Sequence, residues 1–182
     1  HDGGNTLKII LNTLSVSING QYLFFSQADV RYHVFWAILD AKDYAVPQVR
    51  KRIFIVVISE DISKDIPDFS FPTPIKNQEF IGSYVEQNII GYSISRHLQE
   101  SYLFKLDDGK PELIDRNSQI QVKTLCSTYH KFQRLTGTFV KDGDTGIRLL
   151  SENECKAIMG YPQSFIVPVS RTQMYRQFGN SV

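Results

Sequence analysis

An almost continuous apolar run at residues 52–59 constrains the fold of this 182-residue chain more than any other feature. Its β-branched and aromatic residues are typical of strands, and the lack of alternation with polar residues predicts a strand that is buried on both faces. Residues 32–39 have a similar composition and predict a second strand. The residues between them are too few for a crossover helix, so we expect the two strands to run antiparallel.

Helical patterns are found near both ends of the chain. Apolar residues recur every three or four positions across residues 5–18, which predicts a helix with Asn5 as its N-cap. Residues 151–154 match a capping box, in which a serine is followed three positions later by a glutamate. Gly160 and Pro162 predict the end of that second helix. The chain therefore combines helices with a small number of strands.

The middle of the chain has a different character. Residues 61–76 hold three prolines among acidic and hydroxyl residues, which indicates a linker or an extended segment that follows the protein surface. Residues 77–144 contain short apolar runs that are broken by glycine and by Asp-Gly pairs. No helical period persists there, so the sequence predicts a small, irregular and mostly β region.

Composition limits the classes of function. Twenty basic and nineteen acidic residues give a formal charge of +1, so a nucleic-acid site would have to rest on a local cluster of cations. The two cysteines, Cys126 and Cys155, have neither a metal-binding nor a disulfide spacing, which favours a reducing compartment and no metal site. No apolar run is long enough to cross a bilayer and no signal peptide is recognisable, so we expect a soluble, cytoplasmic protein.

Residues 47–52 form the first of three clusters that suggest chemistry. Three cations lie here between a proline and the apolar strand, and Arg50 and Arg52 would share one face of that strand. Two guanidinium groups on a rigid base suit a phosphate or a carbonyl oxygen. A solvated strand end with basic residues is the alternative interpretation.

Two further clusters lie towards the C-terminus. Residues 123–134 interleave hydroxyl groups, an aromatic ring and cations, a mixture that can grip phosphates and read base edges, although polar loops of this kind are common. Residues 177–182 contain a glycine that lets the backbone approach a ligand, with Asn180 and Ser181 able to hydrogen-bond that ligand. An ordinary turn before a helix would explain the same residues.

The order of these clusters resembles the DNA (cytosine-5) methyltransferase family. Residues 39–56 closely resemble its conserved motif VIII, residues 148–162 resemble motif IX, and residues 173–182 resemble motif X. Residues 1–8 are similar to the weaker motif VII, so the resemblance covers essentially the whole chain. The likeness is to bacterial restriction-modification and orphan enzymes, and residues 168–173 are particularly similar to the Dcm group.

The resemblance implies a fold and a division into domains. The family fold is a doubly wound α/β domain that ends in an antiparallel strand pair, of which this chain would be the C-terminal portion. Residues 1–70 would belong to the catalytic domain. Residues 71–146 would form a small, mostly β target recognition lobe that faces the cofactor lobe across double-stranded DNA. Residues 147–182 would return to the catalytic domain.

The resemblance also assigns site residues. Arg52 would hold the O2 edge of a flipped cytosine, Arg50 would fix the site against the backbone, and Asn180 and Ser181 would border the cofactor, S-adenosylmethionine. Thr124 and Leu125 match the family's Thr-Leu dipeptide in a base-reading loop. The expected contacts with DNA are made by Gln48, Thr124, Leu125, Tyr129, Lys131 and Arg134.

Several family features are missing. The nucleophilic cysteine of the family follows proline, whereas Cys126 follows leucine and Cys155 follows glutamate. There is no Glu-Asn-Val triplet and no glycine-rich cofactor loop, and Ala157 stands where the family usually has arginine. We therefore expect the chain to be inactive alone and to need the N-terminal half of a methyltransferase, either from a larger parent chain or from a separate subunit.

The missing half leads to a structural expectation and leaves three alternatives. Without the remaining strands of the sheet, the face formed by residues 53–58 should lose its cover. A stand-alone, sequence-specific DNA-binding or specificity module without catalysis is the main alternative. An RNA-directed relative and an unrelated α/β domain with chance matches are the others.

Overall fold

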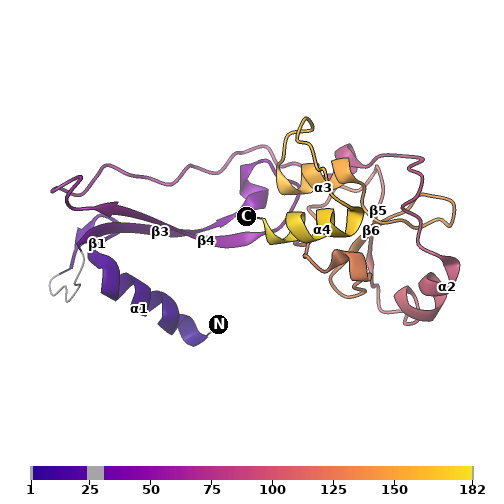
Figure 1. Cartoon of the computed structure of the whole chain (residues 1–182), viewed down its shortest axis with the longest axis horizontal. Helices are drawn as coiled ribbons and strands as arrows, with labels where there is room; N and C mark the ends of the chain where they lie inside the picture. The colour runs from indigo at the N-terminus through magenta and orange to yellow at the C-terminus, as the bar shows by residue number, and fades with distance from the viewer. Residues whose placement is uncertain (1, 24–30, 182) are drawn as a thin grey trace. The chain divides into compact units, whose positions relative to one another are not determined.

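The computed structural model describes residues 2–23 and 31–181, which form two compact units (Figure 1). Unit 1 comprises His1–Leu39 and Lys51–Thr73, and unit 2 comprises Asp40–Arg50 and Pro74–Val182. Each unit is therefore built from two separate stretches of the chain. No helix among the described residues is long and apolar enough to span a membrane.

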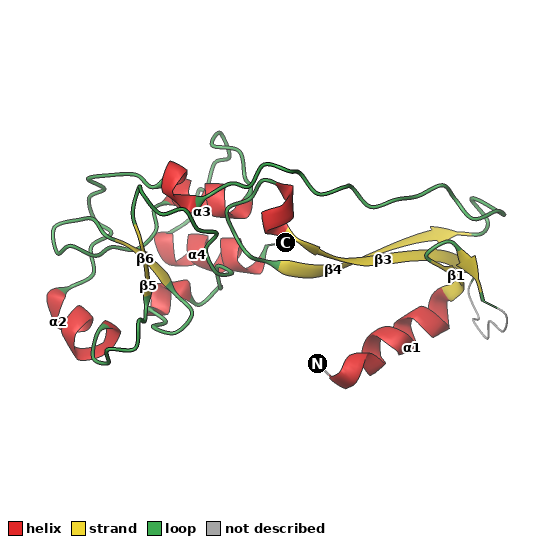
Figure 2. Cartoon of the chain, turned by 180° about the vertical axis from the view of Figure 1, so that it is seen from behind, coloured by secondary structure: helices red, strands yellow, loops and turns green. Residues whose placement is uncertain are grey.

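Among its described residues, unit 1 contains a four-stranded sheet, the short η1 and one α-helix (Figure 2). The strand order is β2-β1-β3-β4, where β1 pairs antiparallel with β2 and parallel with β3. The elements are η1 (Asp2–Gly4), α1 (Asn5–Leu14), β1 (Ser15–Ile18), β2 (Gln21–Tyr22), β3 (Tyr32–Asp40) and β4 (Lys51–Ser59).

The predicted pair of long strands is confirmed as β3 and β4. They are neighbours in the sheet, and Figure 1 shows them side by side. At one end Glu60 N donates to Arg31 O at 3.0 Å, and at the other end Ala41 N donates to Arg50 O at 3.1 Å. This register belongs to an antiparallel pair, as the short connection between the strands required.

The prediction that β4 is buried on both faces is wrong for this structure. Exposed fractions reach 51% for Ile53, 40% for Phe54 and 41% for Val57, and successive residues of a strand point to opposite faces. The reason is that β4 is an edge strand of the sheet, and these apolar side chains lack the cover that parallel sheets normally receive from helices. The expected uncovered face at residues 53–58 is thus present.

The first helix is shorter than the sequence pattern predicts. It ends at Leu14, because the next four residues form β1, whose Ser17 hydroxyl hydrogen-bonds buried His33 Nδ1 across the parallel pair at 2.8 Å. Asn5 is the first helical residue and not the N-cap. The N-cap is Gly4, with a φ of 82° and no side-chain hydrogen bond. Tertiary pairing has overridden helical spacing here.

Residues 61–73 form an extended segment, as predicted. No helix or strand occurs there, and the ring of Phe69 lies 4.9 Å from the ring of Phe35 on β3, centroid to centroid. Phe71 in turn packs edge-on against Phe69 at 5.1 Å. These aromatic contacts hold the segment against the sheet of unit 1.

Unit 2 is dominated by loops and short helices, so the prediction of a mostly β lobe is wrong (Figure 2). Between residues 71 and 146, the described strands are β5 (Glu112–Ile114) and β6 (Thr138–Val140), which pair in parallel. Glycines and Asp-Gly turns interrupt the apolar runs too often for longer ladders. The other elements of unit 2 are η2 (Ala41–Tyr44), η3 (Ile81–Tyr84), α2 (Arg96–Leu98), η4 (Gln99–Leu103), η5 (Tyr129–Lys131), α3 (Glu152–Met159) and α4 (Arg171–Asn180).

The two C-terminal helices share the core of unit 2. Ile158 of α3 and Tyr175 of α4 are almost completely buried in the same cluster as Phe139 of β6. The predicted capping box begins α3, and Gly160 ends that helix in the left-handed conformation with a φ of 71°. Residues 147–182 thus pack on the residues that precede them, and their return to a catalytic domain stays a prediction.

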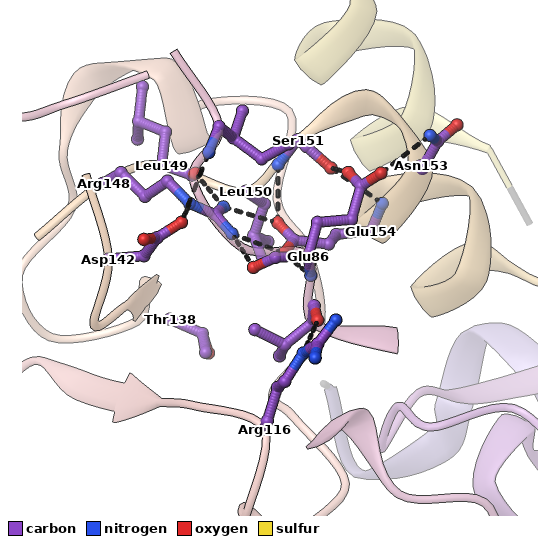
Figure 3. A network of polar contacts seen from close by, with 12 residues as sticks. Glu86, Arg116, Thr138, Asp142, Arg148, Leu149, Leu150, Ser151, Asn153 and Glu154 are labelled. Atoms are coloured by element: carbon purple, nitrogen blue, oxygen red, sulfur yellow. Dashed lines mark hydrogen bonds and ion pairs between the residues drawn. The ribbon is translucent and has the colours of Figure 1, made fainter. Parts of the chain in front are cut away.

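A buried ion network stabilises the irregular part of unit 2 (Figure 3). The Arg148 guanidinium binds both carboxylate oxygens of Glu154 at 2.8 Å, Asp142 at 2.8 Å and the main-chain carbonyl of Glu86 at 2.8 Å. Arg148 and Glu154 are fully buried. Burial opposes the charged form of Arg148, but the hydrogen bonds to Glu154 and Asp142 raise its pKa, so the arginine stays charged.

Breaking this network should destabilise unit 2 strongly. We expect Arg148→Met to lower the free energy of unfolding by about 3–5 kcal/mol, because Glu154 would remain buried without its partner. Hydrogen exchange of core amides in unit 2, such as that of Phe139, measures the effect. Lys141→Met is the matched control, since the Lys141–Asp115 pair is exposed and should contribute less than about 1 kcal/mol. Equal losses in the two variants would contradict the prediction.

Candidate functional site

Residues 46–50 form a short ladder with residues 122–125 inside unit 2. Val49 N donates to Val122 O at 2.9 Å, and Val122 N donates to Pro47 O at 2.9 Å. The Thr124 hydroxyl adds a hydrogen bond to Val49 O at 2.8 Å. The segment that resembles motif VIII therefore binds the loop at residues 122–127 through hydrogen bonds, and this loop contains the Thr-Leu dipeptide.

The Gln48 side chain stabilises this ladder through two buried hydrogen bonds. Its side chain is almost completely buried, donates to Ile158 O at 2.8 Å and accepts from Leu125 N at 2.8 Å. Both ends of the carboxamide are thus used inside unit 2, between the loop and the end of α3. The structure gives Gln48 a scaffolding role in place of the predicted DNA contact.

Arg50 joins the 122–127 loop to the end of α4. Its side chain is buried; Nη1 donates to Leu125 O at 3.2 Å, and Nη2 donates to Gly179 O at 3.3 Å and to Ser181 O. Its own amide donates to Asp40 Oδ1 at 2.9 Å, which fixes the start of the side chain. The Arg50 guanidinium thus binds main-chain carbonyls of this chain and is not presented to a substrate, and its role in a catalytic site stays a prediction.

Gly179 allows the loop and α4 to touch through their backbones. A Cβ atom at this position would lie 2.1 Å from Ser127 N and 2.3 Å from the carbonyl carbon of Cys126. Such distances are far below van der Waals contact, so only glycine fits here without a backbone shift. Its role is close approach to another segment of this chain.

The predicted cofactor-bordering residues lie at this same end of α4. Asn180 is exposed, and the half-buried Ser181 donates its hydroxyl to Phe178 O at 2.8 Å. An exposed carboxamide beside a polar turn is able to border a ligand that has hydrogen-bonding groups. That Asn180 and Ser181 border a cofactor stays a prediction.

Two of the predicted DNA contacts are core residues. The Leu125 side chain is 4% exposed. Tyr129 is buried as well, donates its hydroxyl to Thr138 O at 2.7 Å and accepts from Leu150 N at 3.1 Å. Burial raises the pKa of Tyr129 well above its usual value, so the phenol stays neutral. Both side chains pack the lobe, and neither is available to DNA.

Arg134 is also engaged internally. Its guanidinium donates to Leu103 O at 2.9 Å and to Leu106 O at 3.0 Å, and it forms an ion pair with Asp108. This corrects the predicted DNA contact, since the Arg134 side chain is buried and its guanidinium binds groups of this chain. Among the predicted DNA contacts, Lys131 on η5 is exposed and Thr124 is half-buried.

Arg52 lies on β4 in unit 1. Its side chain is partly buried, and Nη1 donates to the carbonyl of its neighbour Lys51 at 2.8 Å. Among the described residues, this is the hydrogen bond seen for the Arg52 guanidinium, so most of its N–H donors remain available. Because Arg50 and Arg52 belong to different units, a shared site between them stays a prediction.

Sequence reasoning missed two residues of this site. Asp40 was placed in a connecting loop, yet its carboxylate caps the amide of Arg50. Gly179 was interpreted as a ligand-approach glycine, whereas it faces the 122–127 loop. Gly179 lies in the last turn of α4. Glycine is unfavourable within a helix unless close packing requires it, so its position in a helix is the signal for a close backbone contact.

Comparisons with known proteins agree on one family. The family model described as C-5 cytosine-specific DNA methylase matches residues 1–182. The Type II methyltransferase M.MspI of Moraxella sp. is 56% identical over the whole chain, and M.BsuFI of Bacillus subtilis is 51% identical. The chain covers 40% and 41% of the lengths of these relatives. The similarity to the Dcm group stays a prediction.

Solved structures show a similar fold. The Entamoeba histolytica methyltransferase EhMeth aligns with a TM-score of 0.62 at 19% identity, over 83% of this chain and 49% of its own. A mutant of Spodoptera frugiperda DNMT2 aligns with a TM-score of 0.60 at 16% identity, over 90% of this chain and 71% of its own. At these identities the likeness concerns the fold alone.

The buried carboxamide of Gln48 generates a prediction for this site. Gln48→Leu should lower the free energy of unfolding by about 1–3 kcal/mol, because Leu125 N–H and Ile158 C=O would lose their buried partner. Chemical denaturation with amide exchange at Leu125 measures the loss. Gln78→Leu changes an exposed glutamine in the same unit and should cost less than about 0.5 kcal/mol. An equally small effect of Gln48→Leu would refute the scaffolding role.

Proposed function

This chain belongs to the C-5 cytosine-specific DNA methylase family, and we propose that it is the DNA-reading C-terminal part of an enzyme that methylates C5 of cytosine. The observation that carries this proposal is the meeting of three motif-bearing segments at Arg50. Residues 46–50, the loop at 122–127 and the end of α4 are far apart in sequence but share its hydrogen bonds. In the proposed enzyme these segments help to bind the target base, the DNA and the cofactor.

Base binding is the task proposed for Arg52. Cytosine C5 and C6 are inaccessible within a stacked duplex, so the target base must be flipped out before reaction. A guanidinium on a strand can donate to the O2 edge of the extruded base and stabilise negative charge that develops on its ring. Arg52 would be the catalytic residue of this chain, and Arg50 would position the surrounding backbone.

Neither cysteine of this chain suits the role of the nucleophile. Cys155 is completely buried in the core, and burial raises its thiol pKa well above the usual value, which disfavours the reactive thiolate. Cys126 is half-buried, and its thiol lies against the carbonyl of Thr124 at 3.5 Å. The thiolate that adds to C6 would therefore come from polypeptide outside this chain.

S-adenosylmethionine is the proposed source of the methyl group. The residues of this chain fit one side of such a cofactor, since Asn180 is exposed beside the polar turn at Ser181. Their task would be to orient the ligand through hydrogen bonds and to exclude water at the end of α4. The remaining contacts would come from the part of the enzyme that this chain does not contain.

The exposed apolar side chains on both faces of β4 fit that larger enzyme. Ile53, Phe54 and Val57 are each at least two-fifths exposed, which is unusual for a strand of this composition. Since the chain covers 40% of M.MspI, a polypeptide equivalent to the remainder is the proposed cover for these side chains. It would be part of the same parent chain or a separate subunit.

A stand-alone DNA-binding module is the second candidate function. Unit 2 has its own extensive hydrophobic core and carries both the 122–127 loop and exposed Lys131, so DNA reading by this unit would not require a catalytic partner. Catalysis separates the two candidates, because only the enzyme part restores methyl transfer when the remainder is supplied.

The chain alone should not transfer methyl groups. Incubation with radiolabelled S-adenosylmethionine and cytosine-containing DNA should give incorporation at background level, because no suitable nucleophile is present. Adding the polypeptide that corresponds to the rest of M.MspI should restore incorporation. Transfer by the chain alone would sink the fragment proposal, and failure of the mixture would favour the stand-alone module.

Arg52 and Lys131 should act on different steps in the complete enzyme. Arg52→Ala should lower kcat about 10²-fold with little change in the Kd for DNA, because it removes a donor to the reacting base. Lys131→Ala should weaken DNA binding and reduce the slope of log Kd against log salt concentration by about one. Steady-state kinetics and binding titrations at several salt concentrations measure both.

Lys8→Ala on α1 is the control for loss of an exposed cation, and it should leave both quantities unchanged. The reverse pattern, in which Arg52→Ala affects binding and Lys131→Ala affects turnover, would overturn the assignment.

A further inference from the structure

We propose that Arg50 is a positioning residue that couples DNA binding to cofactor binding, by holding the 122–127 loop and the end of α4 as one body. The inference rests on the proposed function, which assigns the loop to DNA and the end of α4 to the cofactor. Both segments and Arg50 belong to unit 2.

Arg50 prevents the two segments from moving apart. One guanidinium arm binds Leu125 O in the loop, and the other binds Gly179 O and Ser181 O at the end of α4. The side chain is 5% exposed, so water cannot readily replace these contacts. The planar guanidinium donates hydrogen bonds to two separate segments at fixed angles. The single ammonium group of lysine cannot reproduce this arrangement of donors.

Gly179 prevents the two segments from moving closer. Even a methyl group at this position would lie 2.1 Å from Ser127 N and 2.4 Å from Ser127 Cα, so the two backbones are already in contact. The separation of the loop from α4 is therefore constrained in both directions. A displacement of one segment must be transmitted to the other.

This constraint has a thermodynamic consequence. Thr124 directly precedes Leu125, which Arg50 binds on the loop side, and Asn180 lies between the two residues whose carbonyls Arg50 binds on the α4 side. A ligand that selects one arrangement of the loop selects the matching arrangement of the Asn180 turn. Linkage then requires that DNA and cofactor change each other's affinity by the same factor, and we expect that change to be an increase.

Gln48 separates this role from simple support of the loop. It attaches the loop to α3 through Ile158 O and makes no hydrogen bond with α4 among the described contacts. The loop thus keeps its anchor on α3 when Arg50 is changed. We expect loss of Arg50 to uncouple the ligands while the loop remains folded.

The complete methylase that contains this chain provides the test. Isothermal titration would give the Kd of S-adenosylmethionine with and without a saturating duplex that carries the target site. We expect the duplex to tighten cofactor binding at least about fivefold in the natural sequence and less than about twofold in Arg50→Lys. Arg116→Lys is the matched control, since Arg116 also donates to a main-chain carbonyl, Val85 O, and should keep the full effect.

Gly179→Ala is an independent second variant. Its added methyl group should force the loop away from α4 and also reduce the effect of the duplex to less than about twofold. Melting temperatures identify a variant that has unfolded, in which case the other variant decides.

The inference is overturned if folded Arg50→Lys or Gly179→Ala keeps the natural effect. It is also overturned if the natural enzyme methylates DNA but shows no effect of the duplex on cofactor binding. Absence of methylation and of both binding events in the natural enzyme would instead remove the proposed function, together with the inference built on it.

Discussion

The buried guanidinium of Arg50 determines how the 122–127 loop and the end of α4 are placed within unit 2. Hydrogen bonds made by a charged group contribute about 1.5–3 kcal/mol each, more than those between neutral groups. Here they are directed at main-chain carbonyls, so they fix backbone positions independently of the side chains that those positions carry. These contacts between the 122–127 loop and α4 therefore do not depend on the side chains of Leu125 and Ser181.

Unit 2 shows how side chains can replace regular hydrogen-bond ladders. Its β5–β6 pair is short, and its loops rely on buried polar groups that bind backbone atoms. Gln48, Arg50, Arg134 and Arg148 all donate to main-chain carbonyls, and Arg148 adds the carboxylates of Glu154 and Asp142. Such contacts hold an irregular chain in one conformation, but each buried group must keep its partner.

The sequence predicts those features that depend on local patterns. The long strands, the capping box of α3 and its terminal glycine follow from composition and spacing, and all are present. The ending of α1 at Leu14 could not be predicted, because pairing of β1 with β3 depends on distant residues. Helix α4 was also missed, since its polar residues and glycine give little helical signal.

Site residues were predicted less well than strands, because residue type does not report burial. Tyr129 and Arg134 have the chemistry of DNA contacts, yet one packs in the core and the other closes a loop with Asp108. The Arg50 guanidinium binds main-chain carbonyls, and these partners lie 75 to 131 positions away in sequence. No local pattern identifies partners at such separations.

The interleaving of the two units constrains how the lobe can be exchanged between proteins. Residues 40–50 connect two strands of unit 1 but belong to unit 2, where Gln48 and Arg50 support the loop. A graft of residues 74–182 alone would not include Gln48 and Arg50. The equivalent residues of the recipient protein would then have to bind the grafted loop. Transfer of this lobe by recombination is therefore best tolerated between hosts that share the short Pro47–Arg50 stretch as well.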